Sequence, residues 1–308
     1  MNKLLRLWTR GFPWWVILFS LFALMWPHFF IPLKSQLGFY FGLTMFGIGM
    51  TLEAEDFKRI LQSPAAVIKG SFLQFSIMPL SSFALAHLFH LPPELALGII
   101  LAGSAPGAMS SNVMTYLVRG DVAYSVSLTT VSTLLAPLLT PLLTFLLAST
   151  FVKVNFWELF FSIITIVIIP LLLGLFLRHR FGSHIKKVLT VFPALSVLAI
   201  VIICAAVVAL NQSRIFQITL ALFLSVFSLN IVGYLGGYYG GKLFGQDLKR
   251  CRTLSIEIGM QNAGLGMVLA LKHFSEAVAL PSALFCIWCI ITTSMMVNAW
   301  NMRMAPEP

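Results

Sequence analysis

The chain has 308 residues, of which 59% are hydrophobic and only 10% are charged, and its formal net charge is +10. Its mean hydropathy of +0.93 lies well above the range of water-soluble domains. These values exclude an ordinary soluble globular domain and indicate an all-α polytopic membrane protein.

Ten apolar runs follow one another along the chain, and a transmembrane helix needs roughly 17 to 25 such residues. The first run follows three cationic residues but no small-residue cleavage pattern, so we expect an uncleaved helix rather than a signal peptide. Little of the chain is left for a soluble domain. We expect ten helices, at residues 13–32, 37–52, 65–90, 94–118, 121–151, 156–178, 188–210, 215–244, 253–272 and 277–302.

The distribution of lysine and arginine predicts the orientation, because cytoplasmic loops retain positive charge. With both termini in the cytoplasm, 16 of the 20 cationic residues fall on the cytoplasmic side. The other four are Lys34, Lys153, Arg214 and Lys272. The positive net charge therefore reflects membrane topology, and no nucleic-acid partner is expected.

Small residues within two of the runs point to close packing. The glycines of "YLGGYYGGKLFG", residues 234–245, have the small-xxx-small spacing of tightly packed helices. Cys286 and Cys289 form a CxxC motif in an apolar run without a nearby histidine, so we expect packed thiols there. The other two cysteines, Cys204 and Cys251, also lie in or at the ends of runs, and no disulfide framework is expected.

The two halves of the chain have the same organisation, with five runs each and a polar, glycine-bearing interruption late in each half. "GSAPGAMSSNVMTY", residues 103–116, corresponds to "TLSIEIGMQNAGLG", residues 253–266, and places Asn112 opposite Asn262. Because five is odd, the second copy must be inverted in the membrane. Inverted repeats with broken helices in matching positions indicate the substrate and ion site of a transporter. We therefore expect one repeat at 1–152 and one at 153–308.

The first interruption combines Pro106, Gly107 and residues that favour helix N-caps, Ser110, Ser111 and Asn112. A break inside a membrane leaves backbone groups unsatisfied, so it is tolerated only where it is buried in protein or lines a cavity. The alternative is one continuous, proline-kinked helix whose serines bond to its own backbone. The matching interruption in the second half favours two broken helices.

Nine of the ten acids lie at the ends of predicted helices or in loops, and only Glu257 is left inside one. A charged side chain at the bilayer centre costs at least about 2.5 kcal/mol, so such an acid indicates function. No lysine, arginine or histidine is expected in the membrane interior as its partner, because those in the predicted helices lie near the helix ends. Neutral oxygens are available instead, and a carboxylate with many neutral oxygens suits sodium or a proton better than a transition metal. These oxygens belong to Gln74, Ser111, Asn112, Ser125, Thr129 and Gln261.

Four segments closely resemble the bile acid:sodium symporter family, especially its bacterial members. They are "LQFSIMPL" (73–80), "SSNVMTYLVRGDVAYSVSLTTVSTLLAPLLTP" (110–141), "IEIGMQNAGL" (256–265) and "LPSALFCIW" (280–288). The resemblance implies ten helices in two inverted repeats, with helices 4 and 9 broken and crossing. It divides them into a panel domain (helices 1, 2, 6 and 7) and a core domain (helices 3–5 and 8–10). It also implies a bacterial inner membrane.

The resemblance also implies two sodium sites. The first falls on Ser111, Asn112, Ser125, Thr129 and Glu257, and the second on Gln74, Glu257, Ile258, Met260 and Gln261. We expect Gly259 to let the ninth helix unwind. Two cations against one carboxylate leave about one positive charge, which with two half-helix N-termini favours an anionic cargo.

The substrate side departs from the family pattern. "GAMSSN" stands where bile-acid-binding relatives have "GGTASN", Trp288, Cys289 and Ile290 replace Trp-His-Asn, and Leu229 replaces a histidine. The resemblance therefore implies a small organic anion that resembles bile acids, or pantoate, ketopantoate or pantothenate, and no obligatory protein partner. The expected substrate residues are Ala108, Met109, Ser110, Asn230, Asn262, Ala263 and Cys289.

Other mechanisms remain as alternatives. Proton coupling through Glu257 needs no metal ion, and a broken-helix pair also suits a channel. An intramembrane enzyme would need a pair of aspartates, a serine and histidine pair or a zinc motif within the helices, and the sequence has none of them. The sequence thus favours a sodium-coupled symporter.

Overall fold

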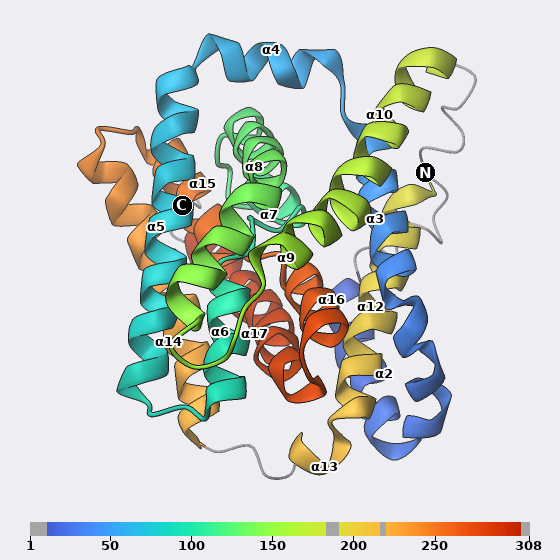
Figure 1. Cartoon of the computed structure of the whole chain (residues 1–308). Coiled ribbons are helices and arrows are strands. Elements are labelled where there is room, and N and C mark those ends of the chain that lie inside the picture. The colour runs from blue at the N-terminus through green and yellow to red at the C-terminus, as the bar shows by residue number, and fades with distance from the viewer. Residues whose placement is uncertain (1–10, 183–190, 216–219, 303–308) are drawn as a thin grey trace.

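The computed structural model describes residues 11–182, 191–215 and 220–302, and these residues form helices joined by short loops (Figure 1). The first half contains α2 (Phe12–Met25), α3 (Leu37–Thr51), α4 (Ala54–Gln62), α5 (Pro64–Leu88), α6 (Pro93–Gly103), α7 (Ser111–Leu117) and α8 (Val122–Ala148). The second half contains α9 (Phe156–Ile163), α10 (Ile169–Phe181), α12 (Phe192–Leu210), α13 (Gln212–Ile215), α14 (Leu220–Leu243), α15 (Leu248–Gly259), α16 (Ala263–His273) and α17 (Glu276–Met302). Short 3₁₀ helices η1 (Pro27–Phe29) and η2 (Ile31–Gln36) precede α3, and the π-helical turn η3 (Ile164–Ile168) joins α9 to α10.

Five helical segments in the described part of the chain are each long and apolar enough to cross a membrane. They are Pro64–Leu88, Val122–Ala148, Phe156–Phe181, Leu220–Leu243 and Glu276–Val297. The pair Trp14–Met25 and Pro27–Thr51 meets the same criterion only together, and it is bent by 108°. The prediction of an all-α, multi-pass membrane protein is confirmed at this level.

The first apolar run does not form the helix predicted at 13–32. Helix α2 ends at Met25, and two 3₁₀ helices follow it. Pro27 lacks the N–H that would continue the helix, and a proline also disfavours the helical conformation of the residue before it. Trp26 accordingly has φ −131° and ψ 66°.

Helix α4 was not predicted, because its charged residues were assigned to a loop. Its N-terminal end is stabilised by a capping box, in which the Glu53 side chain accepts from the backbone of Asp56 and the Asp56 side chain accepts from the Glu53 N–H. Arg178 binds Glu53 at 2.9 Å. This amphipathic helix joins α3 to α5 across one end of the molecule (Figure 1).

The helices pack in two groups. In one group, α12 packs on α2 and α3, and α10 packs on α3. In the other, α5 contacts α6, α8 and α14, while α15 lies on α14 and α17 lies on α6 and α16. Figure 1 shows α2, α3, α10 and α12 together on one side and α5, α14 and α15 on the other. The groups meet where α12 contacts α16 and α17. They also meet where α8 contacts α9, the helix that continues through η3 into α10.

Glycines permit the closest helix contacts. The predicted close packing of the 234–245 segment is confirmed, because Gly237 lies directly against the Leu254 carbonyl of α15. Helices α3 and α10 meet in the same way, at Gly49 and Gly174. A Cβ added to Gly49 would overlap the Leu171 carbonyl oxygen and come within 3.0 Å of the Leu175 nitrogen.

This contact leads to a prediction about stability. Gly49→Ala forces two backbones apart, and such overpacking costs about 1–3 kcal/mol. We expect the apparent melting temperature of the purified protein to fall by about 5 °C. The matched control is Gly42→Ala on the same helix, whose Cβ would meet Pro170 at an ordinary 3.6 Å. Equal melting temperatures for the two variants would contradict the assigned contact.

The two predicted interruptions are real breaks, and they bond to each other. No helix covers 104–110 or 260–262, so a continuous, proline-kinked helix in the first half is wrong. Gly107 and Gln261 form an antiparallel bridge. The Ala108 N–H donates to the Met260 carbonyl and the Asn262 N–H to the Pro106 carbonyl, both at 2.8 Å. Each break thus satisfies backbone groups that the other leaves free.

The two half-helices that follow the breaks begin differently. Asn262 caps α16, and its side chain accepts from the Leu265 N–H at 3.2 Å. Ser110 precedes α7 with helical φ −66° and ψ −18°, and it makes no side-chain cap bond. The helix therefore restarts at the predicted residues, but Ser110 supplies no side-chain cap, since a capping side chain needs non-helical backbone. Asn112 lies inside α7 and not at its start.

Candidate functional site

Glu257 lies in the last turn of α15 and is buried, with 3% of its surface exposed. Its carboxylate accepts hydrogen bonds from Ser111 Oγ at 2.5 Å, from Ser125 Oγ, and from Thr129 Oγ1 at 3.1 Å to each oxygen. Among the described residues it has no ion-pair partner within 4.0 Å. Three hydroxyls from α7 and α8 thus surround one buried acid.

Asn112 brings a further oxygen into this cluster. Its Oδ1 accepts from Ser125 Oγ at 2.8 Å and from Thr129 Oγ1 at 3.2 Å. The structure therefore places all five residues predicted for the first sodium site in mutual contact. They come from the consecutive helices α7 and α8 and from α15 in the other half of the chain, and the pairing of the two breaks brings these helices together.

The cluster has more accepting oxygens than protons. The Ser125 hydroxyl has one proton, yet its oxygen lies within hydrogen-bond distance of Glu257, Asn112 and Thr115. Thr129 Oγ1 similarly faces Glu257, Asn112 and the Ser125 carbonyl, the last at 2.8 Å. Facing oxygens without protons repel one another, and a small hard cation removes that repulsion by binding them together.

The residues predicted for the second site form a neighbouring group. Gln74 Nε2 donates to Gln261 Oε1 at 2.8 Å, and Gln261 Nε2 donates to the Ile258 carbonyl at 2.8 Å. The Met260 carbonyl accepts the Ala108 N–H of the opposite break. These side chains and carbonyls lie together around the end of α15, and in this structure they bond mainly to one another.

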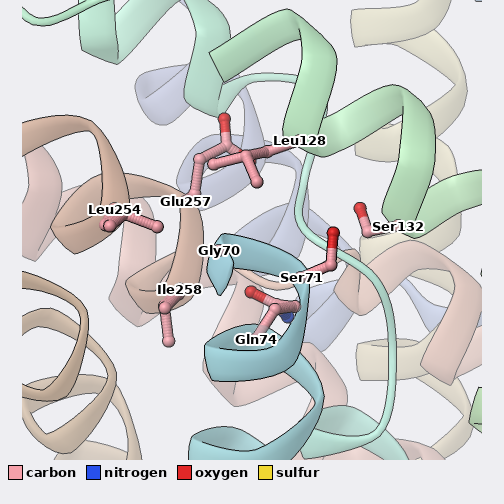
Figure 2. A pocket seen from close by; sticks show the side chains of 8 residues that line it. All are labelled: Gly70, Ser71, Gln74, Leu128, Ser132, Leu254, Glu257 and Ile258. Carbon is pink, nitrogen blue, oxygen red and sulfur yellow. The ribbon is translucent and has the colours of Figure 1, made fainter. Parts of the chain in front are cut away.

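A cavity of about 10 Å³ separates Glu257 from Gln74 (Figure 2). This is about the volume that one water molecule requires, so the cavity is limited to one water-sized species. Its polar lining includes Ser71 and Ser132, which were not predicted. Ser71 Oγ is buried without a hydrogen-bond partner, and Ser132 Oγ donates to the Thr129 carbonyl at 3.1 Å.

The spacing of residues along α5 and α8 could have predicted both serines as part of the site. Ser71 precedes Gln74 by three residues on α5, and Ser132 follows Thr129 by three residues on α8. Residues three apart share a helix face. Each serine therefore extends a face that already carries a predicted ligand, and this periodicity would have identified them.

Glycine is required on both sides of the carboxylate for steric reasons. A Cβ on Gly107 would lie 3.0 Å from Glu257 Oε2. A Cβ on Gly259 would overlap the Tyr234 ring of α14. Gly259 is the last residue of α15, as expected from its predicted unwinding, but the close approach of Tyr234 is what demands glycine there.

The predicted substrate residues do not share one environment. Asn230 is fully buried, where its Nδ2 donates to the Gly259 carbonyl at 2.9 Å and its Oδ1 accepts from Thr292 at 2.7 Å. Cys289 is also buried, and its Sγ contacts the Cys286 carbonyl at 3.3 Å. Asn230 thus stabilises the break, and the thiols are packed as expected. Ala108, Met109 and Ser110 lie in the first break, Asn262 lies in the second break, and Ala263 begins α16.

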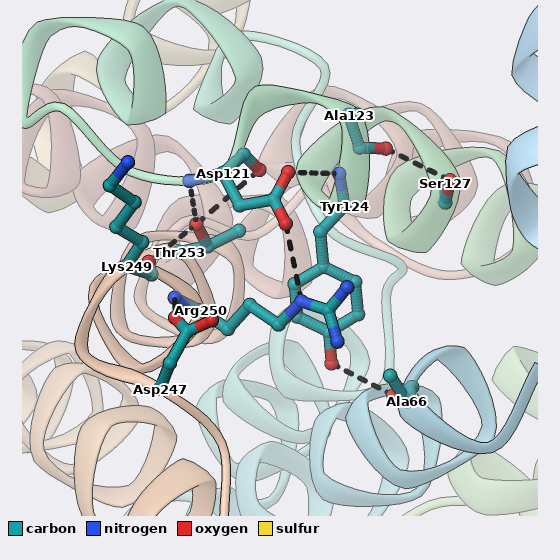
Figure 3. A network of polar contacts seen from close by, with 9 residues as sticks. All are labelled: Ala66, Asp121, Ala123, Tyr124, Ser127, Asp247, Lys249, Arg250 and Thr253. Atoms are coloured by element: carbon teal, nitrogen blue, oxygen red, sulfur yellow. Dashed lines mark hydrogen bonds and ion pairs between the residues drawn. The ribbon is translucent and has the colours of Figure 1, made fainter. Parts of the chain in front are cut away.

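A second polar network joins α8 to the start of α15 (Figure 3). Asp121 caps α8 by accepting from the Tyr124 N–H at 3.0 Å, and its other oxygen binds Arg250 Nε at 3.2 Å. The Asp121 N–H donates to Thr253 Oγ1 at 2.9 Å. Arg250, Thr253 and Glu257 follow one face of α15 at spacings of three and four residues, so this network and the carboxylate cluster are successive contacts of one interface.

Neutralising this network should loosen the neighbouring carboxylate cluster, which is the predicted first sodium site. We expect Asp121→Asn or Arg250→Gln to raise the sodium concentration for half-maximal transport about two- to three-fold. A change of this size corresponds to the small free energy that a partly exposed ion pair contributes. The double variant should show little further change. The control is Lys58→Gln, which breaks the exposed Lys58–Glu55 pair on α4 and should have no effect. Additive effects of the two single changes would argue against direct coupling.

Comparison with known proteins identifies the family. Residues 39–218 match the family model described as "Sodium Bile acid symporter family". The chain belongs to the sodium bile acid symporter family. It is 42% identical to the "Uncharacterized sodium-dependent transporter YocS" of Bacillus subtilis over 96% of this chain and 92% of that protein.

More distant members of the sodium bile acid symporter family come from plants and animals. The chain is 39% identical to the "Probable sodium/metabolite cotransporter BASS1, chloroplastic" of Arabidopsis thaliana, over 97% of this chain and 75% of that protein. It is 32% identical to the "Ileal sodium/bile acid cotransporter" of Oryctolagus cuniculus, over 80% of this chain and 72% of that protein. The relatives are transporters, and the chain is a transporter rather than an enzyme.

Proposed function

We propose that the chain is a sodium-coupled symporter that imports a small organic anion by alternating access. The observation that carries the proposal is the buried cluster of Glu257, Asn112 and three hydroxyls, whose oxygens outnumber their protons. The names of the relatives, which include sodium and metabolite or bile acid, support the same coupling ion and class of cargo.

The proposed architecture has ten helices in two inverted repeats, at 1–152 and 153–308. The group of α2, α3, α10 and α12 would be the panel, and the group built on α5, α8, α14 and α17 would be the core. The pairing of the two breaks supports this arrangement, because it brings the matching segments of both halves together. Alternating access would move the core against the panel, with both termini in the cytoplasm of a bacterial inner membrane.

Two sodium ions are proposed to share Glu257. One would bind Ser111, Asn112, Ser125 and Thr129, and the other would bind Gln74, Gln261 and carbonyls of Ile258 and Met260. For the second ion, Gln74 and Gln261 would turn their oxygens to it. The cavity between Gln74 and Glu257, with the unpaired Ser71 hydroxyl, offers the space for that rearrangement. The cargo would lie at the breaks, beside Ala108, Met109, Ser110, Asn262 and Ala263.

The test is uptake into proteoliposomes. Pantoate, ketopantoate, pantothenate, cholate and short keto acids would be offered under an inward sodium gradient at equal pH. We expect at least one anion to accumulate, and each net positive charge moved with it adds about 2.3 kcal/mol per 100 mV of membrane potential. Accumulation driven by a pH gradient in the absence of sodium would select proton coupling through Glu257 instead.

The two ion sites should be separable by substitution. We expect Asn112→Ala and Gln261→Ala each to raise the half-saturating sodium concentration about ten-fold. Each change removes one oxygen that would bind the cation, and a polar contact to a charged group contributes roughly 1.5 kcal/mol or more. Asn211→Ala is the control, since Asn211 is also buried but binds backbone carbonyls of Val207 and Glu276 at 3.0 and 2.9 Å. Normal transport at low sodium by both site variants would contradict the assignment.

A further inference from the structure

A larger cavity lies away from the ion cluster, at the far end of α16. Its volume is about 640 Å³, within the range of roughly 300–1,000 Å³ typical of small-molecule sites. The cavity lies between η2 and the start of α3 on one side and α16 on the other, with Ile166 of η3 at its edge. It therefore lies between the two groups of helices, and none of the predicted site residues lines it.

Two lysines line this cavity, Lys34 and Lys272. Charge counting places only four of the 20 cationic residues on the outer side of the membrane, so half of that small set borders one cavity. Cations are depleted on this side of membrane proteins, and topology does not explain the pair. The two lysines come from opposite halves of the chain.

The local acids do not neutralise both lysines. Glu276 binds Lys34 Nζ at 2.8 Å and also faces Arg214 at 3.6 Å. Glu158 faces His273 at 3.6 Å. Within the described ranges Lys272 has no carboxylate within 4.0 Å. The cavity edge therefore keeps an excess of positive charge, with Lys272 available to bind an anion.

The rest of the lining is mainly apolar, and it includes Leu37, Ile166, Val268 and Leu271. A cation beside an apolar wall matches an organic anion whose carboxylate meets the lysine and whose carbon skeleton covers the wall. We propose that this cavity is an outer binding site where Lys272 captures the carboxylate of the transported organic anion before it reaches the helix breaks. The proposal rests on the proposed function and adds a second position for the same class of ligand.

The face of α16 that lines the cavity leads directly toward the breaks. Val268 and Gly264 are four residues apart on that face, and Asn262 begins the helix. Between the cavity and Asn262, α3 and α12 close against α16: a Cβ on Gly264 would meet Ile200 at 2.9 Å and Phe41 at 3.1 Å. Phe41 is fully buried. An anion at Lys272 would therefore wait outside this contact until the helix groups separate.

Equilibrium binding tests the outer site without transport. The full chain in nanodiscs would be dialysed against 2-naphthoate, an amphipathic carboxylate, in sodium-free choline buffer, with 2-naphthamide as the uncharged match. We expect saturable naphthoate binding that is at least five-fold weaker in Lys272→Gln and within two-fold of wild type in Lys272→Arg. Naphthamide binding should change less than two-fold.

Two controls separate this proposal from the proposed function. Lys153→Gln removes another cation of the same predicted side that does not line the cavity, and it should bind naphthoate like wild type. Glu257→Gln should also keep naphthoate binding in choline, because the outer site does not use the ion cluster. Absence of saturable naphthoate binding, or equal binding by wild type and Lys272→Gln, would overturn the outer site and leave sodium-driven uptake standing. Failure of sodium-driven uptake with Lys272-dependent binding intact would overturn the proposed function alone.

Discussion

Glu257→Gln is expected to abolish sodium-driven uptake and sodium binding while leaving the protein folded. The carboxylate is the only charge that faces the oxygens of Ser111, Ser125 and Thr129 within the described structure. A neutral amide still accepts hydrogen bonds from these hydroxyls, so the local packing is retained. It does not compensate the charge of a desolvated cation, and two proposed ions would lose their shared ligand.

The measurement is thermal unfolding with sodium or potassium chloride at equal ionic strength. A ligand present at 100 times its dissociation constant stabilises the folded state by about 2.7 kcal/mol. Wild type should gain stability in sodium over potassium, and Glu257→Gln should show no difference. Without sodium the variant should be at least as stable as wild type, because it no longer buries an unpaired carboxylate. Sodium-specific stabilisation of Glu257→Gln would contradict the role of this residue.

Gly259→Ala is expected to have the second-largest effect. Its Cβ would overlap the ring of Tyr234, whose hydroxyl is fixed by hydrogen bonds with the Cys289 carbonyl at 3.2 Å and with the Thr293 hydroxyl. The ring cannot swing aside without breaking these bonds, so the end of α15 must move instead. That movement displaces Glu257, two residues away. We expect transport to fall more than ten-fold, with about 1–3 kcal/mol of destabilisation.

The matched control for this change is Gly240→Ala. Gly240 lies on α14 in the same glycine-rich segment, but its Cβ would meet only the ends of the Leu73 side chain, at 2.8 Å or more. A flexible side chain can move by a few tenths of an ångström, so transport should stay within about two-fold of wild type. Partial recovery of Gly259→Ala by adding Tyr234→Ala would show that the ring causes the defect. If Gly259→Ala transports normally, the steric explanation is wrong.

Much of the site was predictable from residue chemistry. Pro106 and Gly107 identified the first break, and the similar segment at 253–266 identified the second. Glu257 was identified because a lone acid inside an apolar helix is costly. These signals are local. Each depends on one residue type that is unusual within an apolar run, and the hydrophobic composition already identifies those runs as membrane-spanning.

Other features depend on contacts that are distant in sequence. The antiparallel bridge between Gly107 and Gln261 joins residues that no periodicity relates. The same holds for Arg250 on Asp121 and for Tyr234 against Gly259, where only the packing of α15 on α8 and α14 creates the contact. The first helix was placed too long because hydropathy does not register the conformational effect of Pro27.

Sodium-driven uptake in proteoliposomes tests the central claim most directly. Wild type and Glu257→Gln would be compared with an inward sodium gradient at equal pH, and with an inward proton gradient in choline. We predict accumulation of an organic anion by wild type under the sodium gradient alone and none by Glu257→Gln. Accumulation under the proton gradient without sodium, or sodium-driven accumulation by Glu257→Gln, would contradict sodium coupling at this carboxylate.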